Sequence, residues 1–280
     1  MGNILIIGSG GNLGSVLVKG LSGRNNTVNA IGTDQYDILS DDISMLKNIL
    51  SALEIDVIVN CAAMIGIANC EEKRLESFRI NTEFCAKLSE ISLPRKLKII
   101  HFSTDNVFEC NNKNEEHFEK SPTRPTTWYG LTKLSGEVAL KSNSDAVVVR
   151  LPMLISAEIN NQSLTINRLI TKLLSGETVV AYKNVYNSPI FIQSIVPIID
   201  GLVLNNLSCE KLIHITGSQM LSIYDVVFKI ATKMGLNLNK IVGIDLEDAD
   251  SQIRKPKFGG LSADSFPEID FEKQLDIFFN

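Results

Sequence analysis

The alternation of short apolar runs with amphipathic stretches most constrains how this chain folds. Five runs are apolar almost throughout, at residues 4–7, 28–31, 56–60, 97–102 and 146–150. Stretches with helical spacing lie between them, at residues 12–21, 43–53, 75–92 and 129–141. A strand that is apolar on both faces needs helices on both sides of its sheet. The pattern therefore predicts an α/β fold with a doubly wound parallel sheet.

The second half of the chain is less regular and predicts a smaller α+β lobe. Helical spacing recurs at 164–174 and 223–234, a short strand is expected at 211–215, and 182–192 looks extended. We expect residues 1–152 to form the sheet domain, with 188–217 returning to it. The smaller lobe is then assigned to residues 153–187 and 218–280.

Composition excludes several classes of protein. Of 280 residues, 44% are hydrophobic and 21% are charged, and the net charge is −5. A nucleic-acid-binding protein would show a basic total or a basic face, so nucleic acid is not expected as a partner. No apolar stretch reaches the roughly 18 residues of a membrane span, so no membrane partner is expected either. Residues 4–7 lack a preceding basic region, and we expect a strand there, not a secretion signal.

The cysteines and histidines predict neither disulfides nor a metal. The five cysteines, Cys61, Cys70, Cys85, Cys110 and Cys209, are widely spaced and form no C-x-x-C pair. They are typical of free thiols in a reducing compartment, which favours the cytoplasm. The three histidines, His101, His117 and His214, show no metal-ligand spacing, so no metal site is expected. His101 and His214 lie in apolar runs and are interpreted as structural.

A glycine turn follows the first apolar run and predicts a dinucleotide site. Gly8, Gly11 and Gly14 fit G-x-x-G-x-x-G, directly after a strand and at the start of a helix. Glycines in this context make a tight turn, let the backbone approach a pyrophosphate and pack the helix closely on the strand. The N-terminus of the helix supplies N–H groups and a positive dipole end for the phosphates. This is the Rossmann arrangement.

The residues after the second strand bear on the choice of cofactor. In many dinucleotide sites an acidic residue there holds the ribose 2′-hydroxyl. Here Gly32 and Thr33 occupy that place, which leaves room for a 2′-phosphate, although no arginine follows to bind it. NADP is therefore slightly favoured over NAD. Asp37 and Ile38 are expected near the adenine.

Tyr129 and Lys133 stand four residues apart on an expected helix, and this spacing puts both side chains on one face. A nearby ammonium group favours the ionised form of a phenol, so the pair suits proton exchange. Other motif residues follow the ends of two strands: Cys61, Ala62 and Ala63 come after one strand, and S-T-D-N-V-F at 103–108 follows another. Since ligands bind at the carboxyl ends of parallel strands, we expect these residues to meet.

Together these motifs resemble the extended short-chain dehydrogenase/reductase superfamily and, within it, the dTDP-4-dehydrorhamnose reductase family. The resemblance runs over nearly the whole chain. Its pieces are D-V-I-V-N-C-A-A at 56–63, R-I-N-T-E at 79–83, F-S-T-D-N-V-F at 102–108, W-Y-G-L-T-K-L-S-G-E at 128–137, N-S-P-I at 187–190, H-I-T-G at 214–217 and R-K-P-K-F-G-G-L at 254–261.

The resemblance implies an NAD(P)H-dependent reductase of a nucleotide-linked 4-keto-6-deoxy sugar, with a product used in polysaccharide synthesis. Tyr129 would be the proton donor, Lys133 would lower its pKa and hold the nicotinamide ribose, and Thr104 would bind the substrate oxygen. Asn81 would hold a water or a backbone group near the lysine. The first half of the chain would then bind the dinucleotide and the smaller lobe the substrate.

The motifs and the resemblance together assign residues to each ligand. The positions for the cofactor are Gly8, Gly11, Asn12, Leu13, Gly14, Thr33, Asp37, Ile38, Cys61, Ala62, Ala63, Asn81, Ser103, Tyr129, Lys133 and Pro152. The positions for the substrate are Met64, Thr104, Asp105, Asn106 and Met153. Enzymes of this superfamily commonly form homodimers through a pair of helices, which the residues here leave open.

Several positions depart from the family pattern. Asn106 stands where a tyrosine usually follows S-T-D, and Met64 and Met153 lie in stretches that usually carry hydrogen-bonding or aromatic groups. These changes leave the catalytic set intact but place rhamnose itself in question. They also keep open a non-catalytic, NADP-binding regulatory subunit of the same fold. A dehydratase would carry Glu where Asp105 follows the threonine, which favours a reductase.

Overall fold

The computed structural model describes residues 2–24, 26–161, 163–204, 210–248 and 256–279. The expected free thiol of Cys209 and the first residues of the R-K-P-K-F-G-G-L stretch lie outside these ranges. The chain divides into two compact units. Unit 1 comprises Met1–Val107, Thr123–Arg150 and Ile195–Ile213, and unit 2 comprises Phe108–Pro122, Leu151–Ser194 and His214–Asn280.

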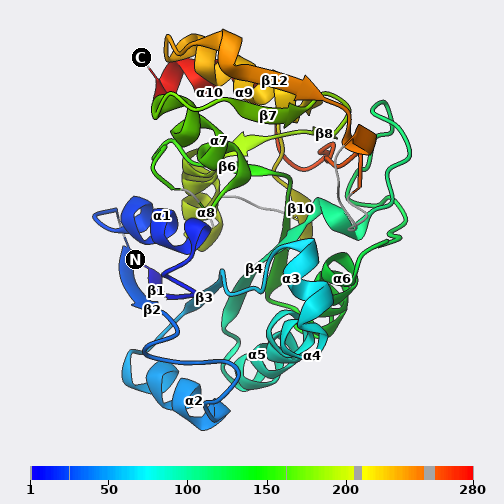
Figure 1. Cartoon of the computed structure of the whole chain (residues 1–280). Coiled ribbons are helices and arrows are strands. Elements are labelled where there is room, and N and C mark those ends of the chain that lie inside the picture. The colour runs from blue at the N-terminus through cyan, green and yellow to red at the C-terminus, as the bar shows by residue number, and fades with distance from the viewer. Residues whose placement is uncertain (1, 25, 162, 205–209, 249–255, 280) are drawn as a thin grey trace. The chain divides into compact units, whose positions relative to one another are not determined.

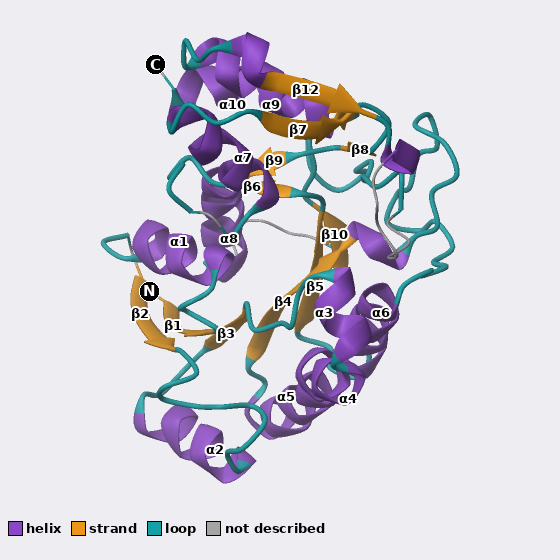
Figure 2. Ribbon diagram, viewed as in Figure 1, coloured by secondary structure: helices purple, strands orange, loops and turns teal. Residues whose placement is uncertain are grey.

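Unit 1 is built on a six-stranded parallel sheet, as the apolar runs predict. Its strands are β1 (Gly2–Ile7), β2 (Asn26–Ile31), β3 (Val57–Asn60), β4 (Lys98–Thr104), β5 (Ala146–Leu151) and β10 (Leu212–His214). They lie side by side in the order β10-β5-β4-β3-β1-β2 (Figure 2). The chain crosses over β1 on its way from β2 to β3, so a topological switch point lies between β1 and β3. The predicted doubly wound α/β fold is confirmed.

The helices of unit 1 cover both faces of this sheet (Figure 1). They are α1 (Asn12–Leu21), α2 (Ile43–Ala52), α3 (Ile67–Glu72), α4 (Arg74–Phe78), α5 (Phe84–Ser92), α6 (Trp128–Leu140) and α8 (Val196–Val203). Helices α1 and α8 pack against each other. Helices α2, α5 and α6 pack on the other face.

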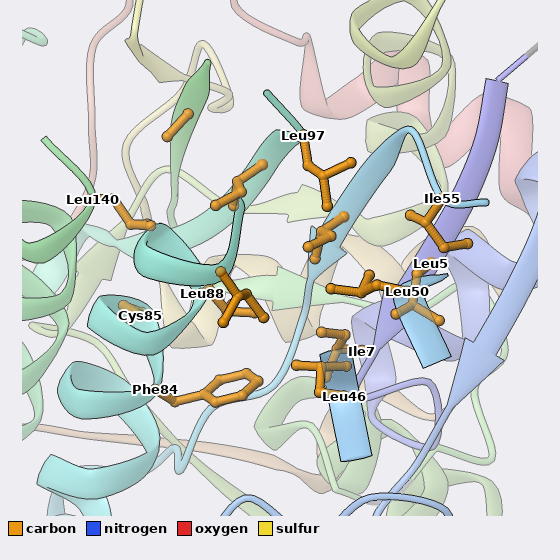
Figure 3. Close-up of a cluster of buried hydrophobic side chains, with 14 of the residues drawn as sticks. Leu5, Ile7, Leu46, Leu50, Ile55, Phe84, Cys85, Leu88, Leu97 and Leu140 are labelled. Atoms are coloured by element: carbon orange, nitrogen blue, oxygen red, sulfur yellow. The ribbon is translucent and has the colours of Figure 1, made fainter. Parts of the chain in front are cut away.

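The core between the sheet and α2, α5 and α6 uses alternate residues of each strand. Leu5 and Ile7 of β1 point into it, together with Leu46 of α2 and Leu88 of α5 (Figure 3). Leu5, Leu46 and Leu88 are fully buried. Each such side chain contributes about 1.5–3 kcal/mol through the area that it removes from water. Leu88→Ala, which leaves a cavity, is expected to cost about 2–5 kcal/mol.

The helix expected over residues 75–92 is interrupted in the structure. Helix α4 continues into a π-helical turn, Arg79–Glu83, and only then into α5. Helix α5 ends at Ser92, where Pro94 opens a short 3₁₀ turn, so the predicted end is confirmed. A π turn inserts one extra residue into the helix and is frequent at functional sites. This turn carries Asn81.

Unit 2 contains short strands and amphipathic helices. Its elements are β6 (Leu154–Ile155), α7 (Thr165–Leu174), β7 (Val179–Tyr182), β8 (Tyr186–Asn187), β9 (Ile190–Phe191), β11 (Leu221–Ser222), α9 (Ile223–Lys233), β12 (Ile241–Ile244) and α10 (Phe271–Phe278). The stretch expected to be extended, 182–192, is divided among three strands. Strands β6 and β9 pair in parallel, as do β7 and β12, whereas β8 and β11 pair antiparallel. The core of this unit gathers around Phe191 and Phe271.

Helix α9 begins with a reciprocal cap. The Ser222 hydroxyl accepts a hydrogen bond from the Asp225 N–H, and the Asp225 carboxylate accepts one from the Ser222 N–H. Two N–H groups that the helix leaves unpaired are satisfied in this way. None of the helices in the described ranges combines the length and apolar character that a membrane span requires.

Candidate active site

The glycine turn joins β1 to α1 and leaves the first turn of the helix without a side-chain cap. The Gly11 N–H donates to the Gly8 carbonyl at 3.1 Å, and the Gly8 N–H donates to Ile31 of β2. The N-cap of α1 is Gly11, which has no side chain to bond the N–H groups of Asn12, Leu13 and the residue after them. That residue is Gly14, where an added Cβ would lie 2.3 Å from the Gly8 oxygen. The helix therefore approaches the strand closely only because residue 14 is glycine.

A cavity of about 380 Å³ opens at the carboxyl ends of β1, β2 and β3. Its lining residues are Ile7, Gly8, Gly11, Gly32, Thr33, Tyr36, Asp37, Ile38, Leu39, Cys61, Ala62, Ala63 and Ile80. Eight of these were assigned to the cofactor from sequence: Gly8, Gly11, Thr33, Asp37, Ile38, Cys61, Ala62 and Ala63. The structure therefore brings together the predicted residues that follow three separate strands. The contributions of Ile7, Tyr36, Leu39 and Ile80 were missed, because apolar and aromatic residues at such places carry no distinct signal.

The loop after β2 is held by its own polar side chains. The Gly32 N–H donates to Gln35 Oε1 at 2.7 Å, and the Gln35 amide donates to Asp34. The carboxylate of Asp37 accepts bonds from the Leu39 N–H and the Ser40 hydroxyl. Thr33 is exposed at the cavity. A cavity lined by glycine and alanine beside an uncapped helix N-terminus fits a dinucleotide, with its pyrophosphate at the start of α1.

Lys133 of α6 is buried, with only 2% of its surface exposed, and it faces β4. Its Nζ donates to the Phe102 carbonyl at 2.7 Å and lies 3.3 Å from Nε2 of His101. Burial lowers the pKa of Lys133, an effect that Cys85 and Glu137 oppose. His101 was interpreted as a structural histidine, which its hydrogen bonds confirm.

The hydrogen bonds around His101 indicate where its imidazole proton lies. The Asn60 Oδ1 accepts from the Ala62 N–H, so its Nδ2 is the atom that faces His101 Nδ1, at 3.0 Å. The imidazole proton then lies on Nε2, because Nδ1 acts as the acceptor. Nε2 is the nitrogen that faces Lys133 Nζ.

Tyr129 also belongs to α6 and is half-buried. Burial raises the pKa of its phenol well above the usual value; a hydrogen bond with Thr104 opposes the rise and the charge of Asp105 adds to it. The sequence-based expectation that Lys133 lowers this pKa stays a prediction, since in the structure the pKa is raised and its largest cause is burial. Tyr129 therefore stays protonated at neutral pH, as a proton donor must.

Thr104 lies at the centre of a small hydrogen-bonded cluster. Its hydroxyl donates to Asp105 Oδ1 at 2.9 Å, and the Asn106 Nδ2 donates both to that hydroxyl and to Asp105. Thr104 and Asp105 are buried, and Asn106 is half-buried. Asn106, which departs from the family pattern, therefore helps to position the threonine hydroxyl.

A buried ion pair behind this cluster was not predicted. Arg150 of β5 binds Glu137 of α6 through two hydrogen bonds, at 2.9 and 2.7 Å. Ser103, assigned to the cofactor from sequence, directs its hydroxyl to the same carboxylate at 2.5 Å. A charged residue inside the apolar run V-V-V-R-L was the available signal, since a buried arginine needs a partner.

Asn81 connects two parts of the site. Its side chain accepts from the Met64 N–H at 2.9 Å and donates to the Met64 carbonyl at 3.0 Å. It also donates to the Thr132 hydroxyl of α6, and the neighbouring Thr82 hydroxyl donates to the Thr132 carbonyl. Asn81 is fully buried. Asn81 thus links the backbone of Met64 to Thr132, the residue before Lys133. Its side-chain amide forms hydrogen bonds within the protein.

The N-terminus of α6 is held by α3 and α4. The Trp128 N–H donates to Glu71 Oε1 at 3.0 Å, and its indole N–H donates to the Ser77 hydroxyl. Further along α6, a Cβ at Gly136 would lie 2.2 Å from the Asn81 carbonyl. These contacts set the position of the helix that carries the tyrosine and the lysine.

The remaining assigned residues are Pro152, Met153 and Cys61. Pro152 is buried and Met153 donates its N–H to Asn187 Oδ1; both belong to unit 2. Cys61 lines the cavity, and burial raises the pKa of its thiol, as it raises the pKa of Cys85 to about 11. These thiols are therefore protonated at neutral pH and poor nucleophiles.

The parallel sheet with a glycine turn and a cavity at its switch point defines a dinucleotide-binding α/β protein of the Rossmann class. The chain matches the RmlD substrate binding domain over residues 2–275, and it belongs to that family.

Known proteins of this kind are similar to the chain. It is 32% identical over 148 residues to a dTDP-4-dehydrorhamnose reductase of Mycolicibacterium smegmatis, an alignment that covers 52% of this chain and 44% of the relative. It is 25% identical over 277 residues to the dTDP-4-dehydrorhamnose reductase of Escherichia coli, covering 95% and 91%. A solved dTDP-4-dehydrorhamnose reductase of Bacillus anthracis in complex with NADP has the same fold, with a TM-score of 0.89 at 20% identity over 99% of this chain and 98% of the other.

Proposed function

We propose that this protein is an NAD(P)H-dependent oxidoreductase that reduces the ketone of a nucleotide-linked 4-keto-6-deoxy sugar. One observation carries the proposal: the protonated phenol of Tyr129, hydrogen-bonded to Thr104, lies on the same helix as the buried Lys133. Membership of the family and the reductases among the relatives support it.

The cofactor proposed is NADP(H), slightly favoured over NAD(H). Gly8, Gly11, Ala62 and Ala63 would hold it along the cavity, with the first-turn N–H groups of α1 at its pyrophosphate. When bound, the cofactor supplies the hydride. The preference rests on Gly32, which stands where many NAD sites carry the acidic residue that holds the ribose 2′-hydroxyl. The Asp34 carboxylate opposes it, since its Oδ1 lies 2.9 Å from where a Cβ on Gly32 would stand.

The residues of the chain have distinct proposed tasks. Tyr129 donates the proton from its Oη to the carbonyl oxygen, and Thr104, held by Asn106, turns its one hydroxyl proton from Asp105 to that oxygen. Lys133 binds ribose hydroxyls and connects the phenol to the polar network around His101. Because the raised pKa of Tyr129 keeps its proton on the phenol, the arrangement favours reduction of the ketone at neutral pH.

The substrate class rests on fewer observations. Met64, Asp105, Asn106 and Met153 are the proposed substrate residues, and unit 2 is proposed to contribute the sugar-nucleotide contacts. Apolar Met64 and Met153 stand in stretches where the family carries polar or aromatic groups. We therefore propose two equal candidates for the substrate: the 4-keto sugar that is reduced to rhamnose, and a different 4-keto-6-deoxy sugar. The product would serve polysaccharide or glycoconjugate synthesis.

Compartment and assembly are also proposals. The described cysteines, Cys61, Cys70, Cys85 and Cys110, form no disulfides, which is consistent with a reducing, cytoplasmic setting. The homodimer that is common in the superfamily stays a prediction, which light scattering on the purified chain tests.

The test is oxidation of NADPH and of NADH, followed by absorbance, with dTDP-4-keto-6-deoxyglucose and its GDP and UDP counterparts. Turnover with one of them, lost in Tyr129→Phe, supports the proposal. Tight cofactor binding without turnover on any of them contradicts it and favours the regulatory subunit instead.

A further inference from the structure

The loop that follows β4 gathers three side chains of the kinds that bind metal ions. Cys110, Glu115 and His117 each present one ligand atom, and these atoms all lie within 4.8 Å of one another. All three belong to unit 2. The sequence predicted no metal here, because C-x₄-E-x-H matches none of the common zinc spacings.

His117 supplies an independent observation that points to a ligand. Only 7% of its surface is exposed, and its Nε2 is buried without a hydrogen-bond partner among the residues that the structure describes. The nearest charged group to this nitrogen is Glu115, whose Oε1 lies 3.9 Å away, beyond hydrogen-bond distance. A buried polar atom without a partner calls for an explanation, and an ion or a water is the usual one.

The imidazole is held in place by its surroundings. Its ring stacks on Phe108, with centroids 4.5 Å apart and planes 6° from parallel. The His117 carbonyl accepts a hydrogen bond from the Ser262 N–H at 3.0 Å. The stacking and the backbone hydrogen bond fix where the ring lies in the loop.

Glu115 and Cys110 are also oriented by the loop. The Asn111 N–H donates to Glu115 Oε2 at 2.7 Å, which fixes the carboxylate and leaves Oε1 facing the histidine. The Cys110 thiol donates to the Asn112 carbonyl at 3.4 Å, and Glu115 N–H donates to the same carbonyl. A carboxylate whose second oxygen is held by a hydrogen bond is the usual arrangement around metal ligands.

We propose that Cys110, Glu115 and His117 form a binding site for one Zn²⁺ ion. A tetrahedral zinc holds its sulfur, nitrogen and oxygen ligands about 3.3–3.6 Å apart. The atoms here have to close by up to about 1.5 Å, a change within reach of side-chain rotation in a loop. Binding releases the thiol proton to solvent, and the thiolate and carboxylate then balance the charge of the ion.

The ligand set selects among metals. Thiolate and imidazole favour Zn²⁺ over Mg²⁺ or Ca²⁺, which prefer oxygen ligands. A water would complete the tetrahedron. The same loop forms one wall of a cavity of about 310 Å³, where Lys113, Glu115 and Glu116 face Ser188 and Ser218. Zinc at this site would fix the shape of that wall.

The experiment uses the purified full chain, stripped with a chelator and free of any affinity tag. Titration with Co²⁺ is followed by absorbance, because a cysteine ligand produces a thiolate-to-cobalt charge-transfer band; competition with Zn²⁺ then gives the zinc affinity. We expect one equivalent of Co²⁺ per chain, displaced by Zn²⁺. Cys110→Ser should abolish the band, and Glu115→Gln should weaken binding by about tenfold or more.

Matched controls separate this site from unspecific binding. Glu116→Gln changes the neighbouring acid, which lines the cavity but is not a proposed ligand, and Cys70→Ser changes a buried cysteine elsewhere. Both should bind Co²⁺ as the unchanged chain does, and circular dichroism checks that every variant is folded. Absence of the band in the unchanged chain overturns the proposal, as does a band that survives in folded Cys110→Ser. Failure of sugar reduction leaves this result unaffected, because the readout does not involve turnover.

Discussion

Gly14 offers a sharp test of the glycine turn. In Gly14→Ala the new Cβ would lie 2.3 Å from the Gly8 carbonyl oxygen, whereas ordinary contacts begin at 3.4 Å. The turn or the helix must therefore move by about 1 Å, at an overpacking cost of roughly 1–3 kcal/mol. Alanine regains about 1 kcal/mol through its helix propensity. The net loss of stability should therefore be no more than about 2 kcal/mol, and the protein should still fold.

Gly14→Ala should reduce the free energy of cofactor binding more than it reduces the free energy of unfolding. A shift of this size removes at least one N–H group of α1 from a bound phosphate, and a hydrogen bond to a charged group contributes about 1.5–3 kcal/mol. The Kd for NADPH should then rise by about 10-fold to 150-fold. Isothermal titration calorimetry measures the Kd, and thermal unfolding measures the stability.

Gly10→Ala is the matched control. A Cβ at Gly10 meets no atom within 4 Å, so this variant should bind NADPH like the unchanged chain. The reasoning is refuted if folded Gly14→Ala binds NADPH with unchanged affinity, or if Gly10→Ala loses as much.

Four further outcomes are expected. Tyr129→Phe should bind NADPH normally but reduce the sugar at least about 100-fold more slowly, since only the proton donor is lost; stopped-flow measurement of a single turnover checks this. Arg150→Met should cost about 3–5 kcal/mol in urea unfolding, because it leaves the Glu137 carboxylate buried and unpaired, whereas loss of an exposed arginine should cost less than about 1 kcal/mol. Ser222→Ala should lower stability by about 1 kcal/mol through loss of the α9 cap, visible as a lower Tm. Burial alone would raise the pKa of Glu119, but N–H donors including that of Asp264 lower it overall. The carboxylate therefore stabilises the fold above its ordinary pKa of 4.5, and this stabilisation is lost as the pH falls below that value. The Tm of Glu119→Gln should accordingly vary less with pH in acid than the Tm of the unchanged chain.

The sheet and its cavity were predictable because their signals are local. Strands β1, β3, β4 and β5 are buried on both faces over most of their length, so their runs are apolar in the sequence itself. The residues at the strand ends follow the runs directly, which is why the sequence could place Gly8, Thr33 and Cys61 at one edge.

The contacts around Lys133 were not predictable in the same way. His101 meets Lys133, and Glu137 meets Arg150, because α6 packs on β4 and β5. No spacing in the sequence encodes that packing. Long-range pairs of this kind depend on the whole fold. The burial of Tyr129, which reverses the expected direction of its pKa shift, has the same origin.

Some elements were missed although a signal existed. Helix α8 was not predicted, although it lies in an apolar run and its Pro197 is well suited to the first turn of a helix. Helix α10 and strand β12 are short and were obscured by the polar stretches around them. The π turn at Arg79–Glu83 has no recognisable pattern, since each residue in it is compatible with an ordinary helix.

The bonds of Asn81 have a consequence for motion. Its side-chain amide forms hydrogen bonds with the backbone of Met64, just beyond Ala62 and Ala63 in the cavity wall. The same amide donates to the hydroxyl of Thr132, which precedes Lys133. These bonds tie the cavity wall at Met64 to α6 at the residue before Lys133. We expect them to limit changes in the separation between the wall and Lys133 when the fold fluctuates.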